Sequence, residues 1–258
     1  MSSLSLRNAD QSMIPLYDIN AVRGKSIINT AIITINVLVF VVLELPLLLQ
    51  GNVLSFNELV KNYGMVPYFV VNGMREYTLL THMWLHGSLE HIAGNMLFLY
   101  IFGDNVEAVL GRRGYLALYL LSGLGAVVFH LLSVMLTPSI ILNPYLRQNP
   151  WLTPAIGASG AISGVLAAYM LFFPHAQVMT LVFAPYPLLI PIRASVFIGL
   201  WFLYQLIMGT WSLSGMPTGV AWWAHIGGFL TGAALAYLLA DRNRIIELRL
   251  RGRYVVYI

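Results

Sequence analysis

The sequence has no cysteine, and this absence excludes disulfide bridges and any mechanism that uses a thiolate as nucleophile. Charged residues are also scarce, because Asp, Glu, Lys and Arg together make up only 9% of the chain. In typical soluble domains roughly a quarter of all residues are charged. The chain is instead 59% hydrophobic, with a mean hydropathy of +0.76. This composition excludes an ordinary soluble protein and predicts a protein that crosses a membrane several times.

Six apolar segments are each close to the ~20 residues that an α-helix needs to cross a bilayer. Residues 50–87, between the first two segments, are only weakly amphipathic, so we expect a folded loop at the membrane interface. We predict an all-α polytopic membrane protein: a six-transmembrane-helix bundle at 26–240, a cytoplasmic N-terminal segment at 1–25 and a basic cytoplasmic tail at 241–258. We expect the tail to lie on the membrane surface or to form an edge strand. The predicted spans are 26–49, 88–109, 115–136, 154–173, 192–210 and 219–240.

The basic residues are unevenly distributed over the segments between the spans. With the N-terminus in the cytoplasm, the outer segments hold only Lys61, Arg75 and Arg147 of the 14 lysines and arginines. The positive-inside rule therefore predicts that both termini are cytoplasmic, which agrees with an even number of spans. This topology also accounts for the net charge of +4, so we expect the lipid bilayer as a partner and no nucleic acid.

Three even-numbered spans each carry a polar side chain close to their start. Asn95 lies about six residues into the second span, Ser159 about five into the fourth and His225 about six into the sixth. Because these spans run in the same direction, a rise of ~1.5 Å per residue puts all three side chains ~8–9 Å below the outer surface. Polar and ionisable groups inside a membrane are costly and usually functional. Three of them at one depth predict a site.

Glycines surround these polar groups at helical spacing. In AHIGGFLTG, His225 shares a helix face with Gly228 and Gly232, three and seven residues later. In GASGAISG, Gly160 and Gly164 are four residues apart. Small residues at this spacing let membrane helices approach closely. If the fourth and sixth spans pack through these faces, His225 reaches the hydroxyl of Ser159.

A serine beside a histidine indicates nucleophilic acyl transfer. The Ser159 hydroxyl needs a general base, which the imidazole of His225 supplies. Asn95, His91 on the same helix face and the backbone N–H of Ser159 are candidate donors to the oxyanion of a tetrahedral intermediate. No carboxylate is found near the depth of His225 in the sequence, because the nearest one along the sixth span, Asp241, lies at its far end. The pattern therefore predicts a Ser–His dyad rather than a triad.

Each signal taken alone has a simpler interpretation. A serine in a glycine-rich membrane helix is more often a packing residue, and an isolated histidine in a membrane is also typical of a proton relay. His82, His86 and His91 invite a metal site, but they lack the H-E-x-x-H pattern and a nearby carboxylate. We expect no metal and no other cofactor.

The combined motifs resemble the rhomboid family of intramembrane serine proteases. The resemblance covers residues 13–241 and includes MIPLYDIN, YGMVP, HGSLEHIAGNMLFLYIFGDNVE, GASG and AHIGGFLTG. It implies that Ser159 is the nucleophile and that His225 is the general base. It also implies that His91 and Asn95 form the pair that stabilises the oxyanion.

Two further positions follow from the same resemblance. Glu107 matches a structural carboxylate at the inner end of the second span. Ser163 stands where some members have a tyrosine that stacks on the general base, so how His225 is held stays open. The family supplies a lateral substrate route beside the fifth span, which here includes Trp201 and Phe202.

The resemblance implies a serine endopeptidase that cleaves single-span membrane proteins within or near their transmembrane segments. It implies a multi-pass protein, and we expect a prokaryotic cell membrane. One alternative is a non-catalytic rhomboid-like protein that binds membrane helices, but such relatives typically lack the serine or the histidine. Another is a small transporter, whose site would lie near the bilayer centre between repeated, broken helices. The shallow common depth and the lack of a repeat argue against it.

Overall fold

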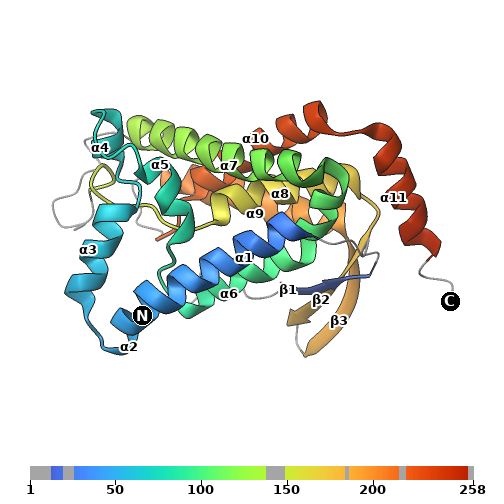
Figure 1. The fold of residues 1–258 in the computed structure, drawn as a ribbon, viewed down its shortest axis with the longest axis horizontal. Helices are drawn as coiled ribbons and strands as arrows, with labels where there is room; N and C mark the ends of the chain where they lie inside the picture. The colour runs from blue at the N-terminus through green and yellow to red at the C-terminus, as the bar shows by residue number, and fades with distance from the viewer. Residues whose placement is uncertain (1–12, 20–25, 138–148, 184–185, 215–218, 255–258) are drawn as a thin grey trace.

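The protein is mostly helical in a computed structural model that describes residues 13–19, 26–137, 149–183, 186–214 and 219–254 (Figure 1). The elements, with π- and 3₁₀-helical segments labelled η, are β1 (Met13–Asp18), α1 (Ile27–Val39), η1 (Phe40–Glu44), α2 (Leu45–Leu49), α3 (Val53–Tyr63), α4 (Pro67–Val71), α5 (Thr78–Thr81), η2 (His82–Trp84), α6 (Leu89–Phe98), η3 (Leu99–Gly103), α7 (Asp104–Leu136), α8 (Ser159–Phe172), β2 (Gln177–Phe183), β3 (Pro187–Arg193), α9 (Ala194–Ser212), α10 (Trp222–Leu239) and α11 (Arg242–Tyr254).

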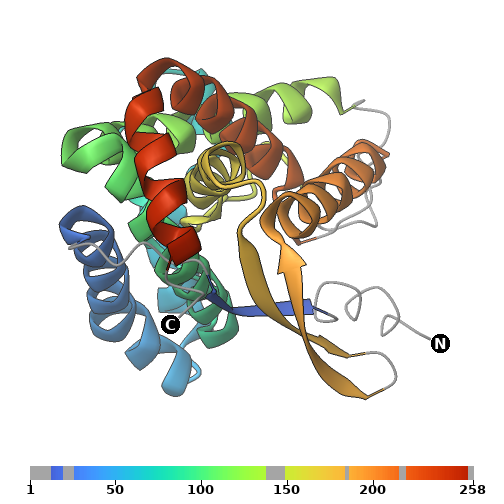
Figure 2. The same ribbon diagram turned by 90° about the vertical axis from the view of Figure 1, so that its right-hand side faces the viewer.

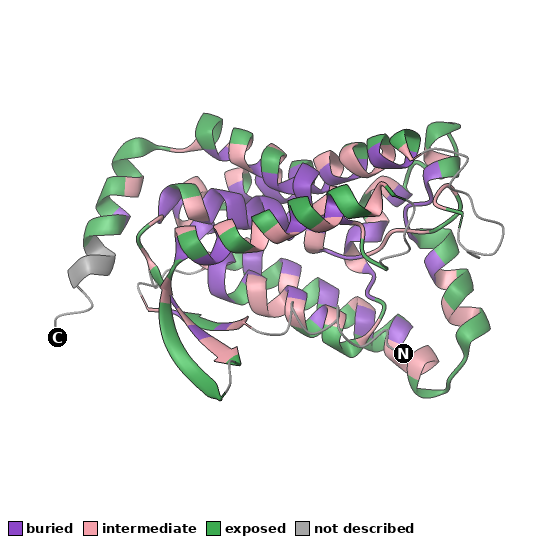
Figure 3. Ribbon diagram, turned by 180° about the vertical axis from the view of Figure 1, so that it is seen from behind, coloured by how far each residue is buried: buried purple, intermediate pink, exposed green. Residues whose placement is uncertain are grey.

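Several of these helices are long and apolar enough to cross a bilayer. Within the described part of the chain they are Ile27–Leu49, Leu89–Leu136 and Ala194–Ser212. A fourth is added if Trp222–Leu239 and Arg242–Leu250, which meet at a bend of 98°, are counted together. Much of their apolar surface faces outward, where lipid rather than protein would cover it (Figure 3). The chain is therefore an integral membrane protein.

The helical stretch Leu89–Leu136 is bent in its middle. Its 48 residues would extend ~72 Å as a straight helix, more than twice the ~30 Å of a hydrocarbon core. The bend lies at Gly111, whose backbone has φ +69° and ψ 173°, a conformation that glycine adopts without steric cost. In Figure 1 the chain doubles back here, so that α6 lies below the second part of α7.

Helix α8 lies at the centre of the molecule, surrounded by α6, α7, α9 and α10 (Figure 2), and nearly all of its residues are buried. Its backbone lies directly against that of α10. A Cβ atom added to Gly228 would overlap the carbonyl oxygen of Gly160, and one added to Gly232 would overlap the backbone of Gly164. The close approach predicted from glycine spacing is thus present between these two helices.

Glu107 joins the start of α1 to α7. Its carboxylate oxygens accept hydrogen bonds from the backbone N–H groups of Ile27 and Ile28, at 3.1 Å each, and of Asn29, at 2.8 Å. The first N–H groups of a helix have no partner within the helix, and they carry partial positive charge. A buried carboxylate from a distant helix therefore caps α1, a role that suits the structural carboxylate expected at this position.

A three-stranded antiparallel sheet corrects the prediction of an all-α protein. β2 pairs with β1 on one side and with β3 on the other. The phenolic hydroxyl of Tyr169 in α8 donates to the carboxylate of Asp18 and so ties β1 to the helices. Short apolar runs such as QVMTLVF are compatible with a strand or a helix extension, so periodicity alone did not reveal the pairing.

Residues 50–87 form a connection built from α3, α4, α5 and η2. The backbones of Met65 and Ala155 pair across it, which attaches this connection to the segment before α8. The guanidinium of Arg75 donates to the carbonyl of Lys61 at 2.8 Å and lies over the ring of Phe69. The connection is thereby fixed to the part of the chain that leads into Ser159.

Of the two alternatives expected for the tail, the edge strand is wrong for residues 242–254, which form helix α11. α11 begins after a bend of 98° and runs down one end of the molecule, at the right in Figure 1. Its Arg249 donates to the backbone carbonyls of Phe172, at 2.5 Å, and of Leu171, at 3.1 Å. These carbonyls end α8, where partial negative charge favours a cation.

Candidate active site

Ser159 and His225 are brought together as the sequence predicts. Ser159 is the first residue of α8, and His225 lies in the first turns of α10. The distance from Ser159 Oγ to His225 Nε2 is 2.8 Å, within the range of a hydrogen bond. The contact between Gly160 of α8 and Gly228 of α10 lies within one turn of this pair. It holds the two backbones close enough for the Ser159 and His225 side chains to meet.

The other ring nitrogen of His225 contacts a residue that the sequence analysis missed. His225 Nδ1 lies 2.7 Å from the side-chain oxygen of Gln205 in α9. Gln205 is 1% exposed. The indole ring of Trp201, one turn earlier in α9, lies 5.9 Å from the imidazole between ring centres. A glutamine within the apolar span 192–210 was the available signal, because a buried amide in a membrane helix requires a partner.

His91 directs one ring nitrogen toward the neighbourhood of Ser159. Its Nδ1 accepts a hydrogen bond from the backbone N–H of Gly87 at 3.2 Å, so its Nε2 carries the proton in the neutral ring. A Cβ on Gly157 would lie 2.8 Å from that Nε2 and 3.6 Å from Ser159 Oγ. Gly157 has φ +123°, so glycine both adopts this backbone and leaves space between the histidine and the serine.

The side-chain nitrogen of Asn95 makes no hydrogen bond to the described residues. The side chain is 8% exposed, and among the described residues its Nδ2 has no hydrogen-bond acceptor. A buried donor without a partner costs about 1–3 kcal/mol, so an unused amide needs an explanation. Asn95 lies one helical turn after His91 in α6, on the same face. The structure thus leaves this amide nitrogen available to an acceptor that binds next to it.

Ser163 does not take the place of a ring stacked on His225. Its hydroxyl donates to the backbone carbonyl of Ser159 at 2.7 Å, within the same helix. The side chain is fully buried. Ser163 therefore reinforces the first turn of α8, while Gln205 and the rings of Trp201 and Trp222 lie beside His225.

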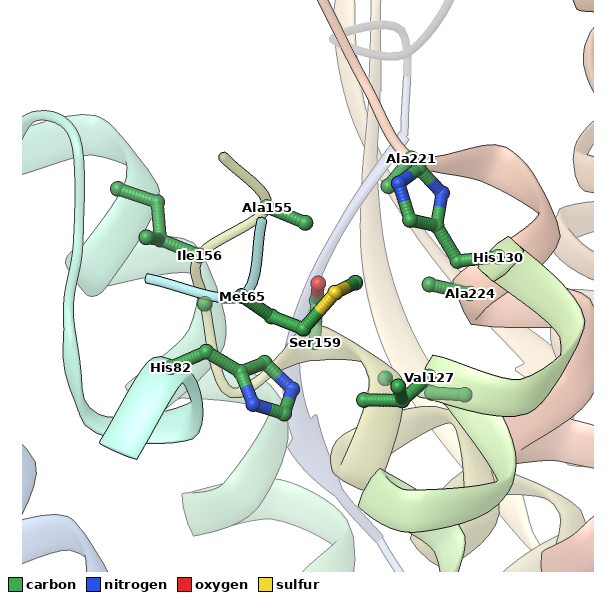
Figure 4. A pocket seen from close by; sticks show the side chains of 12 residues that line it. Met65, His82, Val127, His130, Ala155, Ile156, Ser159, Ala221 and Ala224 are labelled. Atoms are coloured by element: carbon green, nitrogen blue, oxygen red, sulfur yellow. The ribbon is translucent and has the colours of Figure 1, made fainter. Parts of the chain in front are cut away.

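A small cavity of about 30 Å³ lies beside Ser159. Figure 4 shows the Ser159 hydroxyl between Met65 and His82 on one side and His130 on the other. A cavity of about 10–15 Å³ already holds one water molecule if polar partners line it. This cavity, lined by a hydroxyl and two imidazoles, is large enough for a water molecule next to Ser159.

The His82 side chain is held by a hydrogen bond to the preceding turn. Its Nδ1 donates to the backbone carbonyl of Thr78 at 2.8 Å. Burial lowers the pKa of His82 to about 4, so the ring is neutral at pH 7. Within the described ranges no three His, Asp or Glu side chains are grouped as a metal site requires.

Comparisons with known proteins agree with these motifs. The sequence model of the Rhomboid domain matches residues 74–242. The chain is 29% identical to RHOMBOID-like protein 12, mitochondrial, of Arabidopsis thaliana, over 66% of this chain and 48% of that protein. It is 27% identical to Rhomboid protein 1, mitochondrial, of Saccharomyces cerevisiae, over 66% and 44%. It is 32% identical to Rhomboid protease AarA of Providencia stuartii, over 62% and 56%.

The matches cover only part of each relative. The chain spans about half the length of the curated relatives it matches. Two of the three are named as mitochondrial and one is bacterial, so the expectation of a prokaryotic cell membrane has no support from them. What holds is that the chain is an integral membrane protein.

Proposed function

Because this chain belongs to the rhomboid family, we propose that it is a serine endopeptidase that cleaves transmembrane segments of other membrane proteins. The single observation that carries the proposal is the 2.8 Å contact between Ser159 Oγ and His225 Nε2. A hydroxyl hydrogen-bonded to an imidazole at the start of a buried helix is the arrangement that nucleophilic catalysis requires. The name of the bacterial relative, a rhomboid protease, supports the same reaction class.

Acylation begins with transfer of the Ser159 proton to His225 Nε2. The serine oxygen attacks the carbonyl carbon of the scissile peptide bond, and the carbonyl oxygen becomes an oxyanion. When this intermediate collapses, the imidazolium returns its proton to the leaving amine and an acyl-enzyme remains. The dyad acts without an ionised carboxylate beside His225, which suits a site inside a membrane, where such a charge is costly.

We propose that three donors bind the oxyanion. They are the free amide of Asn95, the Nε2–H of His91 and the backbone N–H of Ser159. The N–H at the start of α8 adds the positive end of the helix dipole. Donors that are fixed before the reaction stabilise developing charge without reorganisation, which is the main source of catalysis at such sites.

Deacylation requires water at the serine. The cavity beside Ser159, lined by His82 and His130, is the proposed store for this molecule. His225 removes a proton from the water, the resulting hydroxide attacks the acyl carbon, and the serine regains its proton. In this proposal the cavity supplies water to the acyl-enzyme at a serine that helices otherwise enclose.

The proposed membrane topology has six spans at 26–240, with 1–25 and 241–258 outside the bundle and both termini in the cytoplasm. The bend at Gly111 supports counting 89–136 as two spans. α8, with 14 residues, extends ~21 Å and is short for a span. The unwound segment before Ser159 completes the crossing, and it exposes the start of α8 at the depth of Asn95 and His225.

Incubation of the purified full chain with a generic single-span membrane protein tests the function. The reaction is run in detergent and in liposomes, and the cut is mapped by mass spectrometry. Cleavage at one peptide bond in or near the transmembrane segment, unaffected by EDTA, supports the proposal. Binding of the substrate without cleavage would instead support the non-catalytic alternative, and a complete loss with EDTA that zinc restores would indicate a metal enzyme.

His225→Ala is expected to abolish labelling of Ser159 by a fluorophosphonate as well as cleavage. The serine needs its proton removed before it attacks phosphorus, just as it does before it attacks a peptide carbonyl. Labelling is followed by gel fluorescence, with His175→Ala, a histidine between α8 and β2 and distant from the dyad in sequence, as the matched control. Undiminished labelling of His225→Ala would show that the dyad is assigned incorrectly.

Asn95→Ala is expected to lower kcat by ~100-fold with little change in KM, because an oxyanion donor acts in the transition state. The loss is smaller if His91 and the Ser159 N–H compensate. Thermal stability separates catalysis from packing: a variant that melts normally but turns over slowly supports the role in the oxyanion site. A variant that melts early and regains full kcat when stabilised shows a packing role.

A further inference from the structure

Gln205 makes a contact with His225 that the proposed dyad leaves unexplained. Its side-chain oxygen lies 2.7 Å from His225 Nδ1, the nitrogen that faces away from Ser159. Gln205 is buried on α9, a different helix from those that carry the serine and the histidine. Three helices therefore meet at one chain of hydrogen bonds, from Ser159 through the imidazole to the amide.

The orientation of the Gln205 amide is determined by a second contact. Its nitrogen donates to the backbone carbonyl of Trp201 at 3.2 Å, one turn earlier in α9. A carbonyl is only an acceptor, so the amide nitrogen points toward it and the amide oxygen points toward His225. An amide oxygen is also only an acceptor. His225 Nδ1 must therefore carry a proton, which leaves the lone pair of Nε2 directed at the Ser159 hydroxyl.

We propose that Gln205 is a positioning residue that holds His225 in its Nδ1–H tautomer and fixes the ring plane toward Ser159. The proposal rests on the proposed function, since it assigns a role to the general base of that reaction. Gln205 keeps its hydrogen bond throughout the cycle, because Nδ1 stays protonated in both the imidazole and the imidazolium. The proton from Ser159 moves only on Nε2, and Gln205 neither gains nor loses one.

The chemical type of the residue suits its surroundings. A carboxylate at this position would stabilise the imidazolium more strongly, but an ionised carboxylate buried in a membrane helix is costly. An amide supplies the same acceptor without a charge, and its own nitrogen is satisfied by Trp201. The ring of Trp201 beside the imidazole further restricts rotation of His225. These contacts replace the stacking that a tyrosine in place of Ser163 would have provided.

The test compares Gln205→Leu, which removes the acceptor, with Gln205→Glu, which retains an acceptor of the same length. Loss of the partner of a buried donor costs about 1–3 kcal/mol, so we expect kcat of Gln205→Leu to fall by about 10- to 100-fold. KM should stay within about twofold, because the bond acts on the base rather than on bound substrate. Gln205→Glu should recover most of kcat. Fluorophosphonate labelling of Ser159 should slow in parallel with kcat.

Thr210→Val is the matched control on α9, since its exposed hydroxyl bonds only within its own helix, to the carbonyl of Leu206. It should leave kcat and labelling unchanged. The proposal is overturned if Gln205→Leu keeps kcat within twofold of wild type, or if both Gln205 variants lose activity together with thermal stability. It is also overturned if cleavage falls while labelling stays normal, which would assign Gln205 to substrate contact.

The same experiment separates this inference from the proposed function. Inactive Ser159→Ala together with fully active Gln205→Leu would remove the positioning role and leave the protease intact. Active Ser159→Ala would remove both.

Discussion

Ser159→Ala is expected to reduce cleavage by ~10⁴-fold or more, because it deletes the atom that attacks the peptide bond. The variant should still insert and fold, since within the part of the chain that the structure describes the Ser159 hydroxyl bonds only to His225. The structural contribution of the position comes from its backbone, whose carbonyl accepts from Ser163. Cleavage of a single-span substrate in liposomes, measured alongside the melting temperature, checks both parts of this expectation.

Ser163→Ala is the matched control, because it removes a hydroxyl from the same helix one turn later. Its hydroxyl lies on a backbone carbonyl and makes no contact with His225, so we expect activity within a few-fold of wild type. Cleavage at a near-native rate by Ser159→Ala, with an inactive Ser163→Ala, would show that the nucleophile is Ser163.

Gly228→Ala is expected to disrupt the site without changing a catalytic atom. The added methyl group would overlap the carbonyl oxygen of Gly160. Because this oxygen belongs to the backbone, it cannot move aside by changing a side-chain rotamer. Overpacking of this kind costs about 1–3 kcal/mol, and more when the neighbour cannot shift. Relief by separating α8 from α10 would also move His225 away from Ser159. Since a displacement of ~1 Å costs ~100-fold in rate, we expect a comparable loss of kcat together with a lower melting temperature.

Gly199→Ala provides the control for the glycine-to-alanine change itself. Gly199 lies inside helix α9, and a Cβ added to it would meet no atom within 4 Å. Alanine is the better helix former by ~1 kcal/mol, so this variant should be as stable as wild type or slightly more stable. Equal behaviour of the two variants in melting and turnover would contradict a tight backbone contact between α8 and α10.

The pairing of Ser159 with His225 could be anticipated because it depends on local regularities. A helix has a constant rise and a constant angle per residue, so counting along an apolar span gives both depth and facing. Glycines at spacings of four residues then indicate where two such helices touch. The same counting put His91 one turn before Asn95 on one helix face, and the structure has both residues in α6. That Asn95 acts at the serine stays a prediction.

Other features depend on contacts between residues far apart in the chain, and periodicity carries no information about those. The pairing of β1 with β2 joins Met13–Asp18 to a segment that follows α8, and α11 lies back against the end of α8 through Arg249. Each of these segments is compatible with other structures when taken alone. Only the surrounding molecule selects among them.

The sequence by itself determined that this is a membrane protein, because composition is a property of the chain. It also predicted a serine, a histidine and an asparagine at one depth, because helical spacing can be counted along each segment. Only the tertiary structure decided which nitrogen of His225 carries the proton. That choice depends on Gln205, 20 residues away in the sequence. The amide oxygen of Gln205 is turned toward the ring because its amide nitrogen donates to the backbone carbonyl of Trp201. A tautomer is set by the acceptor that packing brings to the ring, and the spacing of residues along α10 carried no information about an amide on α9.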